Sequence, residues 1–139
     1  MSNEQENVQI VQRMFAAFGQ GNILAGLDTL AENVNWQSPV TRNAPREVSW
    51  AKPRHSREEV AAFFKELFEK MEVERMETLG FTARDDRVVV EGRNRGTVRS
   101  TGRGYEHDWV MVFTLHDNKI IRHRHYYDTA DILVAFRSG

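Results

Sequence analysis

Three histidines in the last quarter of the sequence have the side chains and the spacing for acid–base chemistry. They are His107, His123 and His125. Side chains alternate along a β-strand, so His123 and His125 share one face if their segment is extended. Imidazole titrates near neutral pH and can give or take a proton there. Three interpretations follow: acid–base catalysis, a metal site built from imidazoles, or pocket histidines hydrogen-bonded to their neighbours.

Two predicted strands position these histidines. Tyr105–Leu115 alternates in polarity, His116–Lys119 has the composition of a tight turn, and Ile120–Tyr127 is the expected partner strand. The side chains expected to point inward from this pair are His107, Trp109, Met111, Phe113, Leu115, Ile121, His123, His125 and Tyr127. The face is apolar near the turn and mixed further from it, which favours the floor of a pocket over a plain core.

The rest of the chain supplies elements to cover that floor. Apolar residues at three- and four-residue spacing predict helices at Asn3–Phe18, Ile23–Leu30, Arg57–Met71 and from Asp128 onwards. Further strands are expected at Val34–Trp36, Glu72–Ala83 and Val88–Arg99. Because the long strands follow one another through short turns, the sheet should be mainly antiparallel. Asp128 invites a catalytic role, but its position favours a helix cap.

Aromatic and amide side chains elsewhere are expected to border the same pocket. Trp36 either anchors the core or forms a pocket wall. Phe64 belongs to the apolar face of the third helix, with Val60, Phe63, Leu67 and Phe68. Trp50 lies in the irregular segment Val40–Arg54, which is either a flap over the pocket or a loop that seals the core. The predicted ligand-binding residues are Trp36, Trp50, Phe64, Asn94, Trp109 and Tyr127.

Composition limits the classes of function. The chain has 139 residues, 40% hydrophobic and 28% charged, which suits a single domain over residues 1–139. A net charge of -1 gives no electrostatic reason to expect nucleic acid or a membrane as partner. The absence of cysteine excludes disulfides and thiolate chemistry. The first residues are polar and acidic, unlike a signal peptide, so we expect a cytoplasmic protein.

Short motifs occur in a characteristic order over nearly the whole chain. They are Asn7-Val8, Phe15-Ala16-Ala17-Phe18, Gly21-Asn22, Val34-Asn35-Trp36-Gln37-Ser38-Pro39, Gly102-Arg103, Trp109-Val110-Met111-Val112-Phe113, Lys119-Ile120 and Tyr127-Asp128-Thr129-Ala130. In this order they resemble the SnoaL-like branch of the NTF2-like (ketosteroid isomerase-like) superfamily. The resemblance implies an α+β cone, in which a curved, mainly antiparallel sheet wraps a long helix around an apolar cavity. Further N-terminal helices and a short C-terminal helix complete it.

The same resemblance implies a homodimer and allows two catalytic sets to be compared with this sequence. The dimer would form through the outer sheet face, which carries Arg93, Arg95 and Arg124. The Tyr, base and protonated Asp of ketosteroid isomerase fall at Met14, Ser38 and Trp109. The two Asp and the Arg of limonene-epoxide hydrolase fall at Asn94, His125 and Gly92. Neither set is present, so the fold is indicated but neither activity.

We therefore expect a protein that holds a small apolar or amphipathic ligand in an enclosed pocket. The first hypothesis is an isomerase, cyclase or hydrolase that uses His125 with His123 or His107 for acid–base chemistry, without a metal or another cofactor. The alternative is a non-catalytic ligand-binding or dimerising module. The direction of His123 and His125 discriminates between them, because histidines that face solvent would remove the basis for catalysis.

Overall fold

A single five-stranded sheet and four α-helices make up the computed structural model, which describes residues 3–137. The helical segments are α1 (Glu4–Gly19), α2 (Ile23–Asp28), the 3-10 turn η1 (Arg46–Val48), α3 (Arg57–Lys70) and α4 (Thr129–Phe136). The strands are β1 (Leu30–Gln37), β2 (Met71–Arg84), β3 (Arg87–Val98), β4 (Gly104–His116) and β5 (Lys119–Tyr127). They lie in the spatial order β1-β5-β4-β3-β2.

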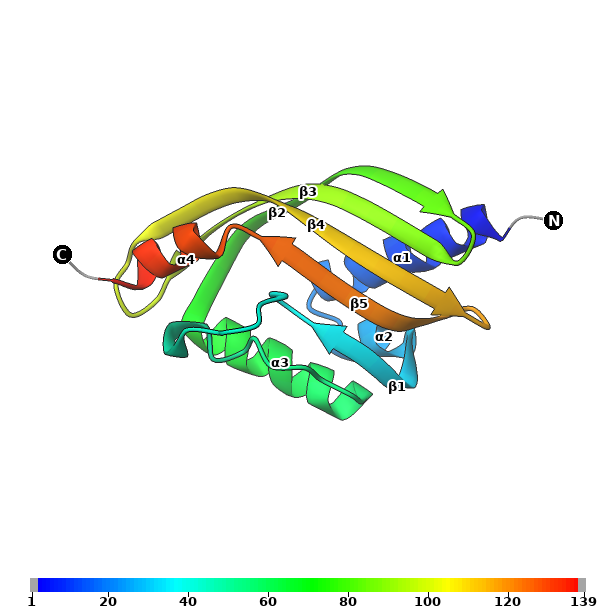
Figure 1. The fold of residues 1–139 in the computed structure, drawn as a ribbon, viewed down its shortest axis with the longest axis horizontal. Helices are drawn as coiled ribbons and strands as arrows, with labels where there is room; N and C mark the ends of the chain where they lie inside the picture. The colour runs from blue at the N-terminus through cyan, green and yellow to red at the C-terminus, as the bar shows by residue number, and fades with distance from the viewer. Residues whose placement is uncertain (1–2, 138–139) are drawn as a thin grey trace.

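The sheet is curved, and the longer helices lie within its curve (Figure 1). Strands β2 to β5 arch over α1 and α3, and α4 lies at the end of the sheet where β5 stops. Each pair from β2 to β5 is antiparallel, whereas β1 runs parallel to β5. The predicted α+β fold with a curved, mainly antiparallel sheet is therefore confirmed.

Alternation along the strands sets which side chains face the helices. In β4, every second residue from Tyr105 to Leu115 is buried. In β5 the expected alternation is wrong at the end that follows the β4–β5 turn, because Ile120 is buried and Ile121 is not. The register shifts there, since Leu115 pairs with Ile120 but Thr114 pairs with Arg122. The extra residue restores the expected phase, so His123 and His125 point inward.

The helices bury one face each, and α3 and α4 begin at side chains that cap them. In α3, Val60 and Phe63 are buried, whereas the exposed fraction of Phe68 is 41%, so its predicted place on the packed face is wrong. Ser56 accepts a hydrogen bond from the backbone of Glu59 at 3.1 Å, and Asp128 accepts one from Asp131 at 3.0 Å. Within residues 3–137, no helix combines the length and the apolar character that crossing a membrane requires.

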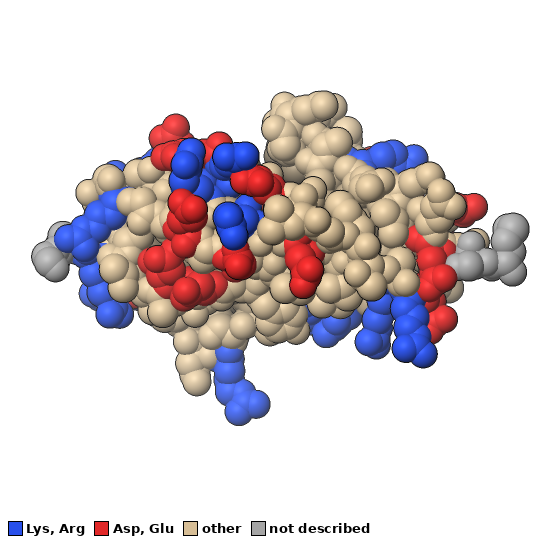
Figure 2. All heavy atoms as spheres, turned by 90° about the horizontal axis from the view of Figure 1, so that it is seen from above, with Lys and Arg blue, Asp and Glu red and all other residues tan. Residues whose placement is uncertain are grey.

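The outer face of the sheet carries charges of both signs (Figure 2). Arg93 lies 3.1 Å from Asp108, and Arg95 lies 3.5 Å from Glu74. Arg124, which we grouped with them, is half-buried instead and donates to the backbone carbonyls of Asn35 and His123. It therefore contributes to the junction between β5 and β1 rather than to the exposed face.

Candidate functional site

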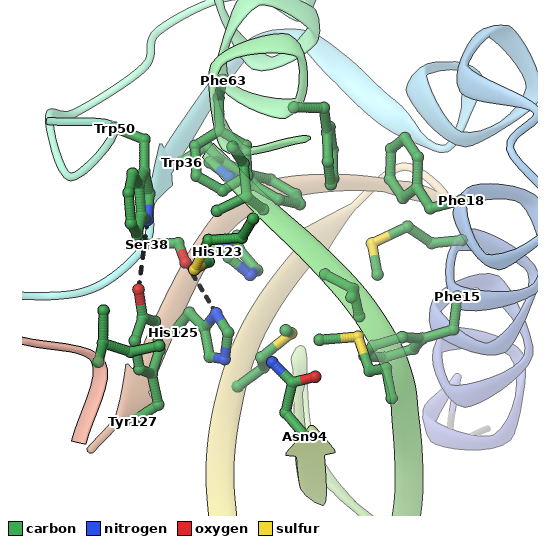
Figure 3. A pocket seen from close by; sticks show the side chains of 18 residues that line it. Phe15, Phe18, Trp36, Ser38, Trp50, Phe63, Asn94, His123, His125 and Tyr127 are labelled. Atoms are coloured by element: carbon green, nitrogen blue, oxygen red, sulfur yellow. Dashed lines mark hydrogen bonds between the residues drawn. The ribbon is translucent and has the colours of Figure 1, made fainter. Parts of the chain in front are cut away.

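A cavity of about 90 Å³ lies between the inner face of the sheet and helices α1 and α3 (Figure 3). Its lining comprises 18 residues, most of them apolar or aromatic. The polar side chains that line it, apart from the two indoles, are Ser38, Asn94, His123, His125 and Tyr127. Among the residues that the structure describes, no carboxylate and no cationic Lys or Arg joins them. An apolar chamber with a few convergent polar groups is typical of small-molecule sites.

His125 projects from β5 into this cavity (Figure 3). Its Nδ1 atom lies 2.7 Å from Ser38 Oγ, while its Nε2 atom is buried with no hydrogen-bond partner in the described range. Burial, and to a smaller extent the charge of His107, lowers the pKa of His125 from 6.5 to about 3. The ring is therefore neutral at physiological pH, and Nε2 is the atom that a ligand can reach.

His123 is a second neutral imidazole at the cavity wall. Its ring is 0% exposed and stacks on Trp36, with ring centroids 3.6 Å apart. Burial, followed by the nearby His125 and Arg124, lowers the pKa of His123 well below 6.5. Neither ring nitrogen has a hydrogen-bond partner within residues 3–137. His123 thus forms an aromatic wall with two unpaired polar atoms.

Tyr127 and Asn94 supply the remaining polar groups of the lining. Trp50 Nε1 donates to Tyr127 Oη at 3.2 Å, and burial raises the pKa of Tyr127, so the phenol keeps its proton. Because that oxygen already accepts one hydrogen bond, its proton is still available to donate. The Asn94 amide lies across the His125 ring from Ser38 (Figure 3), and its Oδ1 atom lacks a partner in the part of the chain described.

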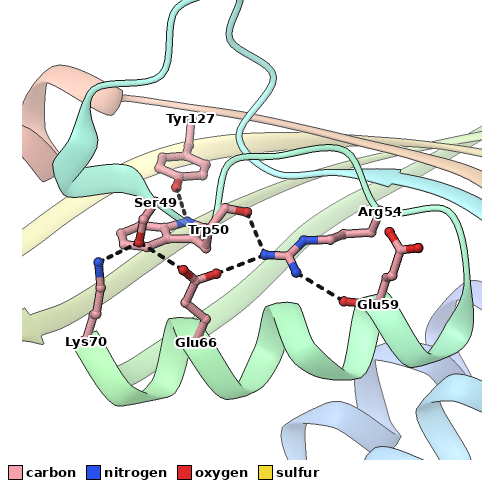
Figure 4. Close-up of polar contacts among 7 residues, drawn as sticks. All are labelled: Ser49, Trp50, Arg54, Glu59, Glu66, Lys70 and Tyr127. Atoms are coloured by element: carbon pink, nitrogen blue, oxygen red, sulfur yellow. Dashed lines mark hydrogen bonds and ion pairs between the residues drawn. The ribbon is translucent and has the colours of Figure 1, made fainter.

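A polar network attaches the segment that carries Trp50 to α3 (Figure 4). The buried Arg54 side chain donates to Glu66 at 2.9 Å and to the backbone carbonyl of Trp50 at 3.3 Å. Burial alone would raise the pKa of Glu66, but hydrogen bonds from Ser49 and Arg54 lower it. The segment is therefore packed down, and Trp50 is fully buried at the cavity wall. This arrangement fits a sealing loop and leaves the flap hypothesis without a contact that favours it.

The structure brings most of the predicted site residues to the cavity but not all of them. Those that line it are Trp36, Trp50, Phe64, Asn94, His123, His125 and Tyr127. Trp109 and His107 are outside the lining, so their expected place is corrected. The Trp109 ring packs behind the lining, against the rings of Phe15 and His125, with centroids 5.8 and 5.6 Å away. His107 Nδ1 is 2.9 Å from Asp131 instead.

One functional candidate that the sequence left aside is Ser38, which holds His125. We considered this position only as the place of an absent carboxylate base. Its partner His125 lies 87 residues away in the sequence, and the two meet because β1 pairs in parallel with β5. No local sequence pattern predicts that pairing. The interpretation of the histidines as a metal site gains no support. Within residues 3–137, no three His, Asp or Glu side chains are grouped to hold a metal ion.

Comparison with known proteins identifies the family. The family model of the SnoaL-like domain matches residues 11–123, so the match includes Trp36, Ser38 and Asn94 and ends at His123. No curated protein matches the sequence. Position 125, which carries the unpaired nitrogen, lies just beyond the matched range, and its role must be argued from the structure.

Solved structures share the fold over almost the whole chain. An NTF2-like protein from Burkholderia xenovorans is 33% identical, with a TM-score of 0.84, over 99% of this chain and 100% of that chain. A candidate SnoaL-like polyketide cyclase from Jannaschia is 21% identical, with a TM-score of 0.84, over 100% and 96%. TerC, co-crystallized with polyporic acid, is 21% identical, with a TM-score of 0.84, over 95% and 98%. This chain belongs to the SnoaL-like family of NTF2-like proteins.

Proposed function

We propose that this protein binds a small, mainly apolar molecule in the cavity and transfers a proton on it through His125. The observation that supports this most directly is the state of one imidazole. Its Nδ1 atom is held by Ser38 at 2.7 Å, while Nε2 is buried among apolar side chains without a partner in residues 3–137. Buried polar atoms are normally paired, and an unpaired one is costly. A ligand atom that hydrogen-bonds to Nε2 would remove that cost.

An intramolecular proton transfer of the isomerase or cyclase type fits these groups best. Nε2 takes a proton from a carbon next to a carbonyl group, and the C–H electrons form an enolate. In an isomerase, the proton returns to another carbon of the conjugated system. In a cyclase, the enolate carbon forms a bond to a second carbonyl carbon, whose oxygen takes the proton. Either course regenerates the neutral imidazole and consumes no other reactant.

Groups inside the cavity would stabilise the imidazolium and the enolate that this reaction forms. A pKa of about 3 makes His125 a weak base, but an enolate beside the imidazolium would raise that pKa. The Tyr127 hydroxyl and the Asn94 amide border the same cavity and would donate to the enolate oxygen. Hydrolysis is less well supported, because no carboxylate in the described lining could activate water.

Ligand binding without turnover is the second candidate. The low basicity of His125 favours it, since His125 would then act only as a hydrogen-bonding anchor. Proteins of the same fold support a small-molecule pocket under both candidates. The protein from Jannaschia carries the name of a polyketide cyclase, and TerC was co-crystallized with polyporic acid.

Deuterium exchange separates the two candidates. Cyclic ketones of one ring would first be screened for a rise in melting temperature, because a specific ligand stabilises the folded state. The ketone that binds would then be incubated in D₂O, and loss of its α-proton signal would be followed by NMR. We expect exchange with the native protein and with His116→Ala, but not with His125→Ala. Binding without exchange in the native protein would favour the anchoring role.

We also propose that two copies of the chain associate through the outer sheet face. Val110 and Val112 are only half-buried there, and the exposed fraction of Tyr126 is 47%, which gives the face an apolar strip beside its paired charges. A two-fold axis through such a strip pairs apolar surface with itself. Sedimentation at micromolar concentration should give a dimer that Val110→Asp dissociates, and a monomeric native protein would refute this assembly.

A further inference from the structure

A second, larger hollow lies outside the inner cavity, between α1, the C-terminal half of α3 and β2. This outer groove has a volume of about 620 Å³ and is lined mainly by aromatic and aliphatic side chains. Phe68 and Met76 belong to it and are 41% and 42% exposed, although large apolar side chains are usually buried. Its two charged residues already have partners outside it, because Arg75 pairs with Glu77 and Glu74 pairs with Arg95. The groove therefore presents a mainly apolar surface, in which the two charged side chains are paired with residues outside it.

The inner cavity and the outer groove share one wall. Two side chains each from α1, α3 and β2 line both spaces: Phe15, Phe18, Phe64, Leu67, Val73 and Met76. The Phe18 and Phe64 rings close part of this wall, with centroids 4.4 Å apart. Side chains, rather than backbone, separate the two spaces, and rotamer changes are fast at partly exposed positions. A change of rotamer at this wall would join the groove to the cavity.

Polarity divides the combined space into two ends. Ser38, His125, Trp50 and Tyr127 form a polar end, and Phe15 and Phe18 project from the opposite side, where the shared wall stands (Figure 3). The inner cavity, at about 90 Å³, is smaller than the apolar cavity of about 150 Å³ that admits benzene. Even one ring therefore needs space beyond the closed inner cavity, which a change of rotamer at the shared wall would supply, and the groove has room for a further apolar part.

Building on the proposed function, we infer that the natural ligand is an amphipathic molecule of two parts. A polar head of one ring reaches His125 in the inner cavity, and an uncharged apolar tail passes between Phe18, Phe64 and Met76 into the outer groove. The head supplies the hydrogen bonds, and the tail supplies most of the buried apolar area. Because the outer groove is lined mainly by apolar side chains, the tail should determine both the affinity and the specificity of binding.

A series of 4-alkylphenols tests this arrangement with defined compounds. Dissociation constants of phenol, 4-ethylphenol, 4-butylphenol and 4-hexylphenol would be measured by calorimetry. Each methylene that leaves water should tighten binding about fourfold. Phe68→Asp should weaken the binding of 4-hexylphenol about tenfold or more and leave the binding of phenol unchanged, because the new carboxylate would contact only the alkyl tail. Leu24→Asp is the matched control, since Leu24 is 82% exposed and outside the groove, and should change neither constant.

The remaining outcomes are equally defined. Thr78→Asp, at an exposed groove position, repeats the test if Phe68→Asp does not fold. Affinity independent of tail length, no binding by any member at millimolar concentration, or equal weakening of phenol and 4-hexylphenol would each overturn the inference. So would a Phe68→Asp protein that loses its dimer while tail affinity stays the same, since a second copy would then occupy the groove. If His125→Ala leaves the dissociation constant of phenol unchanged, the role of His125 is refuted. The role of the groove is tested separately, by how affinity depends on the length of the alkyl tail.

Discussion

The two buried imidazoles should make the protein lose stability in mild acid, and replacing one of them should remove half of that loss. The pKa of His123 and that of His125 are both lowered from 6.5 in the folded state. Below pH 6.5 the unfolded chain therefore binds protons that the folded chain does not. The stabilising contribution is complete above pH 6.5 and falls as the pH decreases towards the folded values. From pH 6 to pH 5, each histidine should lower the free energy of unfolding by about 1 kcal/mol.

His123→Met is the informative perturbation, because methionine fills a similar volume against Trp36 and carries no unpaired nitrogen. At pH 7.5 its free energy of unfolding should lie within about 1 kcal/mol of the native value. Between pH 6 and pH 5, the histidine-dependent loss of unfolding free energy should be about 2 kcal/mol in the native protein and about 1 kcal/mol in His123→Met. Urea unfolding followed by circular dichroism at each pH gives these values. His116→Ala is the control, since His116 is exposed at a turn. Equal losses in native protein and His123→Met would mean that His123 is protonated in the folded state.

Two further predictions concern the elements around the site. Phe63→Ala should cost about 3–5 kcal/mol, and Phe64→Ala less, because Phe63 is buried whereas Phe64 is only half-buried and also borders the groove; equal costs in urea unfolding would contradict this packing. Glu66→Ala should cost about 3 kcal/mol because it leaves the buried Arg54 without its carboxylate. Glu69→Ala, at an exposed position of the same helix, is its control, and a matching small loss in both would show that the network does not hold the Trp50 segment.

Local patterns in the sequence were sufficient to predict most of the side chains on the inner face of the sheet. Side chains alternate strictly in β3 and β4, so Asn94 and Met111 could be assigned from parity alone. The assignment of His123 and His125 was right although Ile121 was not. The phase was inferred from Ile121, at the turn end of β5, and the irregular pairing at that end returns the histidines to the expected face. A bulge of one residue leaves no mark in composition, so it could not be foreseen.

Features that depend on long-range pairing were beyond the sequence. The position of His107 depends on how far β4 extends past β5, and the structure gives it Asp131 as a partner rather than the cavity. Ser38 reaches His125 only because β1 lies parallel to β5, and hairpin signals do not predict parallel neighbours. Phe63 and Phe64 are adjacent on the apolar side of α3, and a period of 3.6 residues does not decide which one is more deeply buried.

The parallel pairing of β1 with β5 also has a consequence for synthesis on the ribosome. Trp36 and Ser38 are made early, but their partners His123 and His125 are made 87 residues later. A nascent chain that already contains α1, β1 and α3 therefore has no strand against which β1 can close. Its aromatic side chains must stay exposed to water, or to chaperones, until β5 emerges. Translation pauses before β5 would lengthen that exposure, whereas pauses after it would come too late to matter.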